Sequence, residues 1–270
     1  MFDRLAKRMK SRSAALVLRI DDSLDRILQL WLFVAGAMAV ARIAFSHIPS
    51  GRADLSTFAS YMLVILAPLV STLLALRWFA EGDRMPQPVT RLAVIGRWRS
   101  VEPFEARRHA LYGCNGIMVS LLVGMMINVP VRTAEYFTAM PPLPISPPPW
   151  LSALHIAMTF DVVLFGSLYM IAFVAALRHV PLFPRLLAAI WLGDLLMQLI
   201  TAQFVANAGG LPPAVAVALR NLLHGNVLKA LVSAALWLPY LLLSTRVNVT
   251  YRRRVPIEQA DAPRLAASSG

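Results

Sequence analysis

Cysteine, charge and the motifs of common soluble enzymes are all scarce in this sequence. Cys114 is the single cysteine among 270 residues, so no disulfide can form within the chain. Zinc fingers and iron–sulfur clusters lack sequence support because neither cysteine pairs nor Cys/His clusters occur. P-loop, G-x-S-x-G, H-E-x-x-H and dinucleotide-binding motifs are also missing, so an enzymatic function would rest on scattered residues. Only 15% of the residues are charged, against about 25% in an average soluble domain.

Hydrophobic residues, in contrast, make up 58% of the chain and gather in long stretches. A helix needs about 20 mainly apolar residues to cross the hydrocarbon core of a bilayer. Six segments meet this requirement: Ile27–Phe45, Phe58–Phe79, Leu111–Val131, Trp150–Leu177, Leu182–Ala206 and Asn221–Leu243. Backbone groups in lipid must be paired within their own segment, which a helix achieves. The sequence therefore predicts an all-α, polytopic transmembrane helical bundle of six spans.

The basic residues indicate how the spans are oriented. Twenty-six Lys and Arg residues against 14 Asp and Glu residues give a net charge of +12. Because the basic residues lie between apolar stretches, the predicted partner is a bilayer with anionic head groups and not nucleic acid. Twenty-one of them lie before the first span, in the second and fourth connections and in the tail, whereas the opposite loops hold Arg52, Arg132 and Arg220. The positive-inside rule then predicts a multi-pass protein of the bacterial inner (plasma) membrane with both termini cytoplasmic.

Composition divides the chain into five predicted segments. They are a cytoplasmic basic amphipathic segment (1–26), a two-span front (27–79), a basic cytoplasmic segment (80–110), a four-span bundle (111–250) and a disordered cytoplasmic tail (251–270). The first segment is interpreted either as a helix lying on the inner leaflet or as a simple positive anchor. The outer loop 141–149 contains six prolines and is predicted to be a stiff spacer, with partner docking as the alternative.

Ionisable residues inside the predicted spans carry most of the functional signal, because a charge at the centre of a membrane costs about 2.5–3.5 kcal/mol. Asp161, Asp194 and Lys229 lie at similar depths when each helix rises about 1.5 Å per residue. We expect Lys229 to pair with one or both aspartates in the interior. Gln198 and Ser233 lie on the same helix faces and extend the predicted polar network. Three interpretations remain open: an ion pair that fixes helix packing, a proton or ion relay, and a binding site for a polar head group or solute.

Two further residue patterns inside the spans support a function less strongly. His155 and His224 lie at matching depth on different spans, and two such histidines can hold a b-type haem or a metal. One histidine pair in six spans is commonly a coincidence, so no cofactor is predicted. Gly116, Ser120, Gly124 and Asn128 recur every four residues and predict a face for close helix packing.

The end of the last span carries a recognisable motif. The string PYLLLSTRVNVTY, residues 239–251, resembles the closing signature P-Y-x-x-x-S-x-R-V-x-x-T-F/Y of an uncharacterised bacterial inner-membrane family, domain of unknown function 2569. The resemblance implies a four-span bundle over roughly residues 109–255 and no particular activity. From the residues themselves we expect interface anchors that meet anionic head groups, with a partner docking site as the alternative. These anchors are Tyr240, Arg246, Arg252, Arg253 and Arg254.

Short loops and the lack of a soluble domain favour a non-enzymatic role. The leading interpretation is a subunit, accessory factor or scaffold of a membrane assembly, in contact with another membrane protein or a second copy of the chain. The alternative is a small ion-coupled transporter or permease that uses Asp161, Asp194 and Lys229, although neither inverted repeats nor matched broken helices are visible. An intramembrane enzyme that acts on lipid is the third possibility.

Overall fold

The computed structural model describes residues 2–46, 54–89 and 97–257, with side chains placed from residue 12 onward. Six of the helices it describes are long and apolar enough to cross a membrane, which confirms the predicted all-α bundle and identifies an integral membrane protein. They are α2 (Leu24–Ala44), α3 (Leu55–Trp78), α5 (Ile117–Ala139), α6 (Pro149–Leu177), α7 (Phe183–Asn207) and α8 (Pro213–Leu243).

The third span lies further along the chain than predicted. It was expected at 111–131, whereas α5 begins at Ile117 and continues to Ala139. Gly113 and Gly116 adopt positive φ angles of 94° and 65°, a conformation that glycine tolerates and that interrupts a right-handed helix. The helix therefore starts after Gly116 and extends past the apolar stretch, which places Arg132 inside the span and not in the outer loop.

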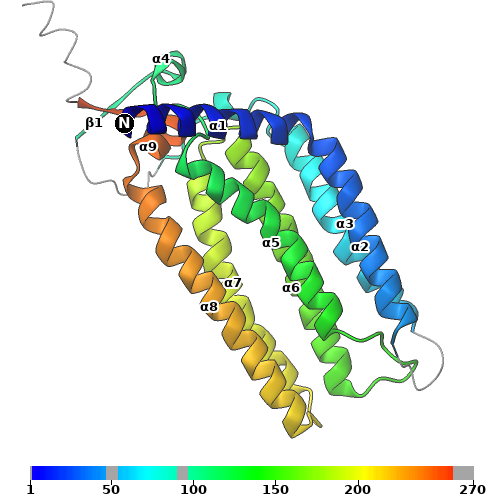
Figure 1. The fold of residues 1–270 in the computed structure, drawn as a ribbon. Helices are drawn as coiled ribbons and strands as arrows, with labels where there is room; N and C mark the ends of the chain where they lie inside the picture. Colours follow the sequence, from blue (N-terminus) through cyan, green and yellow to red (C-terminus); the bar gives the residue numbers. More distant parts are fainter. Residues whose placement is uncertain (1, 47–53, 90–96, 258–270) are drawn as a thin grey trace, which may run out of the picture.

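Helix α6 lies at the centre of the bundle (Figure 1). It packs closely against α3, α5 and α7, and α8 packs against α7 on the far side. Residues 172–176 of α6 are completely buried, as are Phe183 and Leu187 of α7. Since lipid tails are as apolar as these side chains, tight packing and not water exclusion is what holds such helices together. The close contact of α3 with α6 joins the predicted two-span front directly to the predicted four-span bundle.

The first helix, α1 (Phe2–Asp22), lies crosswise over one end of the bundle (Figure 1). Its described contacts with the bundle include a hydrogen bond from the Gly116 N–H to Ser13 Oγ at 2.9 Å, an ion pair of Arg178 with Asp21 at 3.2 Å, and the burial of Ile20 in the hydrophobic core. A helix is thus present within the predicted basic amphipathic segment, residues 1–26. The side chains that would form its amphipathic face mostly precede residue 12, so its contact with lipid stays a prediction.

Both ends of the described chain lie at this same end of the bundle, as six spans require (Figure 1). The 3₁₀ helix η1 (Gly82–Arg84) and helices α4 (Pro103–Arg108) and α9 (Thr245–Arg252) lie here too. Strands β1 (Trp98–Ser100) and β2 (Arg254–Pro256) pair in antiparallel fashion and link the second connection to the end of the chain. The predictions of a basic cytoplasmic segment at 80–110 and of a disordered tail at 251–270 fall partly on residues 90–96 and 258–270, which lie outside the described residues.

Helix α9 closes this end by folding back into the protein. The Tyr251 hydroxyl donates to the Ala176 carbonyl of α6 at 2.9 Å, and the Gly113 N–H donates to Thr250 Oγ1 at 3.0 Å. Val247 and Tyr251 are at most 1% exposed. The end of the motif, residues 247–251, is therefore an internal contact surface.

The arginines of this motif require a correction. Arg252 is 4% exposed and donates to the carbonyls of Leu241 and Leu242, which lie at the C-terminal end of α8. The last carbonyls of a helix lack helical partners and carry partial negative charge, so a guanidinium satisfies them well. Arg246 donates likewise to Leu111 and Gly113, and Arg253 to Asp83 and Met85. The predicted anchoring of Arg252 to head groups is thus replaced by contacts inside the protein. Arg246 and Arg253 are half-buried, and with Tyr240 and Arg254 they stay predicted anchors.

Candidate functional site: a polar groove between α5 and α8

A groove of about 490 Å³ runs between α5 and α8, with α6 and α7 as its floor. Helices α5 and α8 are not among the closely packed pairs of the bundle, so the space between them stays open. The polar or small residues that line the groove are Ser120, Gly124, Asn128, Arg132 and Glu135 of α5, Asp161 and Tyr169 of α6, Asp194 of α7, and Asn226, Lys229 and Ser233 of α8. The walls also include Trp191 and Trp237.

Small residues keep the groove open where the sequence suggested close packing. A Cβ atom added at Gly124 would meet no atom within 4 Å, and the same is true of Gly225 on α8. Ser120, Gly124 and Asn128 of the predicted stripe line the groove, whereas Gly116 contacts Ser13 of α1. Three of the four positions of the predicted helix-packing face thus line open space in the single chain, and close packing at this face stays a prediction.

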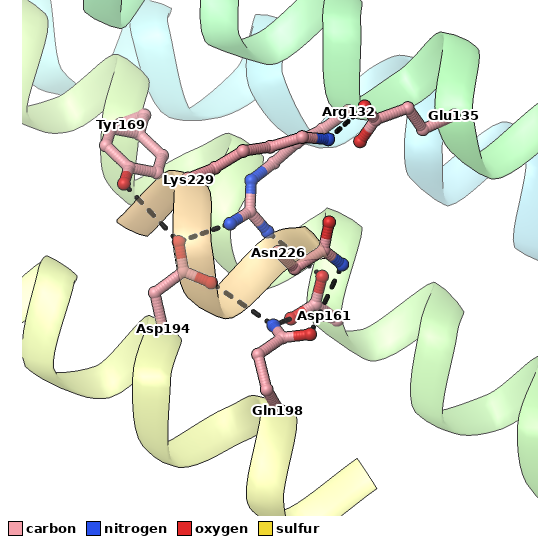
Figure 2. Close-up of polar contacts among 8 residues, drawn as sticks. All are labelled: Arg132, Glu135, Asp161, Tyr169, Asp194, Gln198, Asn226 and Lys229. Atoms are coloured by element: carbon pink, nitrogen blue, oxygen red, sulfur yellow. Dashed lines mark hydrogen bonds and ion pairs between the residues drawn. The ribbon is translucent and has the colours of Figure 1, made fainter. Parts of the chain in front are cut away.

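At the floor of the groove, Arg132 bridges Asp161 and Asp194 (Figure 2). Its Nη1 lies 3.0 Å from Asp161 Oδ2, and its Nη2 donates to Asp194 Oδ2. Gln198 Nε2 donates to Oδ1 of both aspartates, at 3.2 and 3.3 Å. The exposed fractions of the Arg132, Asp161 and Asp194 side chains are 13%, 5% and 2%. The structure thus brings the two predicted aspartates and Gln198 into one buried network.

The predicted pairing of Lys229 with these aspartates is corrected. Lys229 pairs instead with Glu135 across the mouth of the groove, and the two side chains are 60% and 37% exposed (Figure 2). Arg132 is a better partner for two carboxylates because its planar guanidinium presents parallel N–H groups in a fixed fork. It was missed because it follows the apolar stretch of α5 and was counted with the outer loop. The apolar Tyr136, Phe137 and Met140 beyond it were the signal that the helix continues.

Two supporting contacts complete the network. The Tyr169 hydroxyl donates to Asp194 at 3.4 Å, and Asn226 Nδ2 donates to Gln198 Oε1 at 3.2 Å. Asn226 thereby connects α8 to the floor formed by α6 and α7. Ser233, the other predicted member on α8, lines the groove one helical turn beyond Lys229.

The two histidines have very different surroundings. His155 is 2% exposed and its ring lies 6.2 Å from that of Tyr136, between centroids. His224 is exposed on the surface of α8. No group of three or more His, Cys, Asp or Glu side chains suited to a metal occurs among the described residues. A haem or metal held by these histidines was the weaker interpretation from the sequence and stays untested.

The charges of the site do not balance when all groups are ionised. Glu135 and Lys229 cancel at the mouth, whereas Arg132 compensates only one of the two aspartates at the floor. An uncompensated charge out of water is costly, so the floor favours an additional positive charge, from a proton or from a bound group. The site can therefore hold a cationic or hydrogen-bond-donating group inside the membrane.

Comparison with models of protein families, with curated proteins and with solved structures finds no match to this chain.

Proposed function

We propose that this protein is a non-enzymatic membrane-embedded binding protein, acting as a subunit or accessory factor, whose α5–α8 groove binds a polar group within the membrane. The observation that supports this most directly is the buried Arg132–Asp161–Asp194 network at the floor of a groove that opens between two membrane-spanning helices. We likewise propose that the chain belongs to the uncharacterised inner-membrane family whose closing signature residues 239–251 resemble.

The cost of leaving this groove empty in lipid supports a bound partner. A charged side chain at the centre of a bilayer costs about 2.5–3.5 kcal/mol on insertion scales, and Lys229 and Glu135 are both partly exposed in the isolated chain. A ligand or partner with a polar group would cover them and lower that cost. The volume of about 490 Å³ also falls within the range of roughly 300–1,000 Å³ that is usual for ligand sites.

A second candidate is a small ion-coupled transporter. It is favoured by the sharing of a single guanidinium between Asp161 and Asp194, which leaves one carboxylate for a proton or cation. Uptake of a solute by reconstituted vesicles that is lost in Asp194→Asn, with the fold intact, would favour transport over binding alone.

Filling the groove tests the proposed function. We expect Gly124→Phe to reduce the ligand that co-purifies with the protein, measured by native mass spectrometry, by about tenfold or more, because the ring occupies open space without displacing protein atoms. Gly36→Phe is the matched control, since Gly36 lies in α2, outside the groove, and also has nothing within 4 Å. Equal ligand content in both variants would contradict a binding role for the groove.

We also propose that the end bearing α1 and α9 faces the cytoplasm of a bacterial inner membrane. The support is that the arginine-rich N-terminal and second-connection segments meet at this end (Figure 1). We expect Ser146→Cys, in the opposite loop, to react with a membrane-impermeant maleimide in intact spheroplasts. Reaction only after lysis would reverse the orientation.

A further inference from the structure

We infer that the polar group received by the groove is a primary ammonium, so that the ligand is an amine. The inference rests on the proposed function and adds the chemical class of the ligand. It follows from the charges, the hydrogen-bond acceptors and the surroundings of the floor.

The charges of the groove select a cation. Three carboxylates and two basic groups line it, so it carries one net negative charge when all are ionised. The basic groups are already engaged: both terminal nitrogens of Arg132 face aspartates, and Lys229 faces Glu135. An anionic ligand would have to break one of these pairs, whereas one ammonium would compensate the remaining charge directly.

The acceptors at the floor match the three donors of an ammonium. A carboxylate offers about four lone-pair positions, and within the described part of the chain each oxygen of Asp161 accepts from a single donor, Arg132 on one and Gln198 on the other. Asn226 uses its amide nitrogen to reach Gln198, which leaves its side-chain oxygen to accept a further bond. A donor-rich cation can therefore bind without displacing Arg132. A quaternary ammonium carries the same charge and lacks the donors.

The walls fit an amine that carries an apolar portion. Trp191 and Trp237 line the same groove, and the indole face attracts a cation. Because the groove lies between membrane-spanning helices, an amine can arrive as a lipid head group or as a smaller solute. Both sources offer the same ammonium to Asp161 and Asn226.

The test uses the full chain in nanodiscs of phosphatidylcholine and phosphatidylglycerol, which contain no primary amine. Octylammonium, octyltrimethylammonium and octanol are titrated separately while tryptophan fluorescence and the unfolding temperature are recorded. We expect octylammonium to shift both saturably and octyltrimethylammonium and octanol to bind about tenfold more weakly or not at all, because they lack the charge-assisted N–H bonds. Asp161→Asn should weaken octylammonium binding by about tenfold or more, and Asn226→Leu should weaken it by a smaller factor. Gly36→Phe should leave it unchanged.

Further discs distinguish the two sources. A shift with phosphatidylethanolamine in the disc and none with free ethanolamine identifies a lipid amine, and the reverse identifies a solute. If octanol and octylammonium bind equally and Gly124→Phe abolishes the binding of both, the inference of an ammonium ligand is overturned while the groove remains a binding site. Octylammonium shifts that persist unchanged in both Asp161→Asn and Gly124→Phe would overturn the inference and remove support for the groove as well. The absence of any shift with the amines would also overturn the inference.

Discussion

Replacing Arg132 with methionine should destabilise the protein by about 3–5 kcal/mol, because it leaves two carboxylates buried without their cation. The Asp161 and Asp194 side chains are 5% and 2% exposed, so water cannot take the place of the guanidinium. The measurement is thermal unfolding and folded yield in mild detergent. Restoring the balance of the site in the triple variant Arg132→Met, Asp161→Asn, Asp194→Asn should recover much of the loss.

Lys229→Met is the matched control for this prediction. It removes a cation from the same groove, but from a pair at the mouth whose side chains are 60% and 37% exposed and which water can reach in detergent solution, so the expected loss there is about 1 kcal/mol or less. Comparable destabilisation by the two methionine variants would show that the network at the floor is not the dominant polar interaction of the bundle.

Truncating Tyr251 to alanine should destabilise the protein by about 3–5 kcal/mol, the usual cost of removing a buried aromatic side chain. The ring is 1% exposed, and its centroid lies 4.9 Å from that of Phe183, so its loss leaves a cavity where α9 meets α7. Burial lowers the pKa of the neighbouring His179 to about 4, so that ring is neutral beside Tyr251 at pH 7. Thermal unfolding measures the effect.

Tyr251→Phe separates packing from hydrogen bonding at this position. It keeps the ring and removes the bond to the Ala176 carbonyl, so the expected loss is about 1 kcal/mol. A loss as large as that of Tyr251→Ala would mean that the hydroxyl, and not the packed ring, holds α9 in place.

The sequence predicted the membrane architecture well because a span leaves a local signal. An apolar stretch of about 20 residues is visible without knowledge of its neighbours, and all six stretches became helices. The structure differs from the prediction at α5, where glycine and arginine residues, and not apolar side chains, determine the bounds of the span. Gly113 and Gly116 delay the start of α5. Arg132 lies inside the span because it pairs with Asp161 of α6 and Asp194 of α7.

The candidate site was only partly predictable. Spacing and depth placed Asp161, Asp194 and Gln198 in one region, and the structure brings them together. Which cation lies between them depends on the rotation of α5 and α8 about their axes, and the depth of Lys229 carries no information on that rotation. Likewise, Arg252 looked like a surface anchor because the fold-back of α9 depends on contacts with Ala176 and Gly113, which are remote in sequence.

The accessibility of the groove from water tests the account most directly. Ser233 and Leu231 lie two residues apart on α8; Ser233 lines the groove, whereas Leu231 is 49% exposed on the outer surface of the isolated chain. We expect the cationic thiol reagent 2-aminoethyl methanethiosulfonate to modify Ser233→Cys in proteoliposomes and to leave Leu231→Cys unmodified, because a thiol in hydrocarbon does not ionise. Burial raises the pKa of the native Cys114 thiol to about 12, so it should contribute little background. An unreactive Ser233→Cys would show a sealed helix seam and contradict a groove that receives a polar ligand.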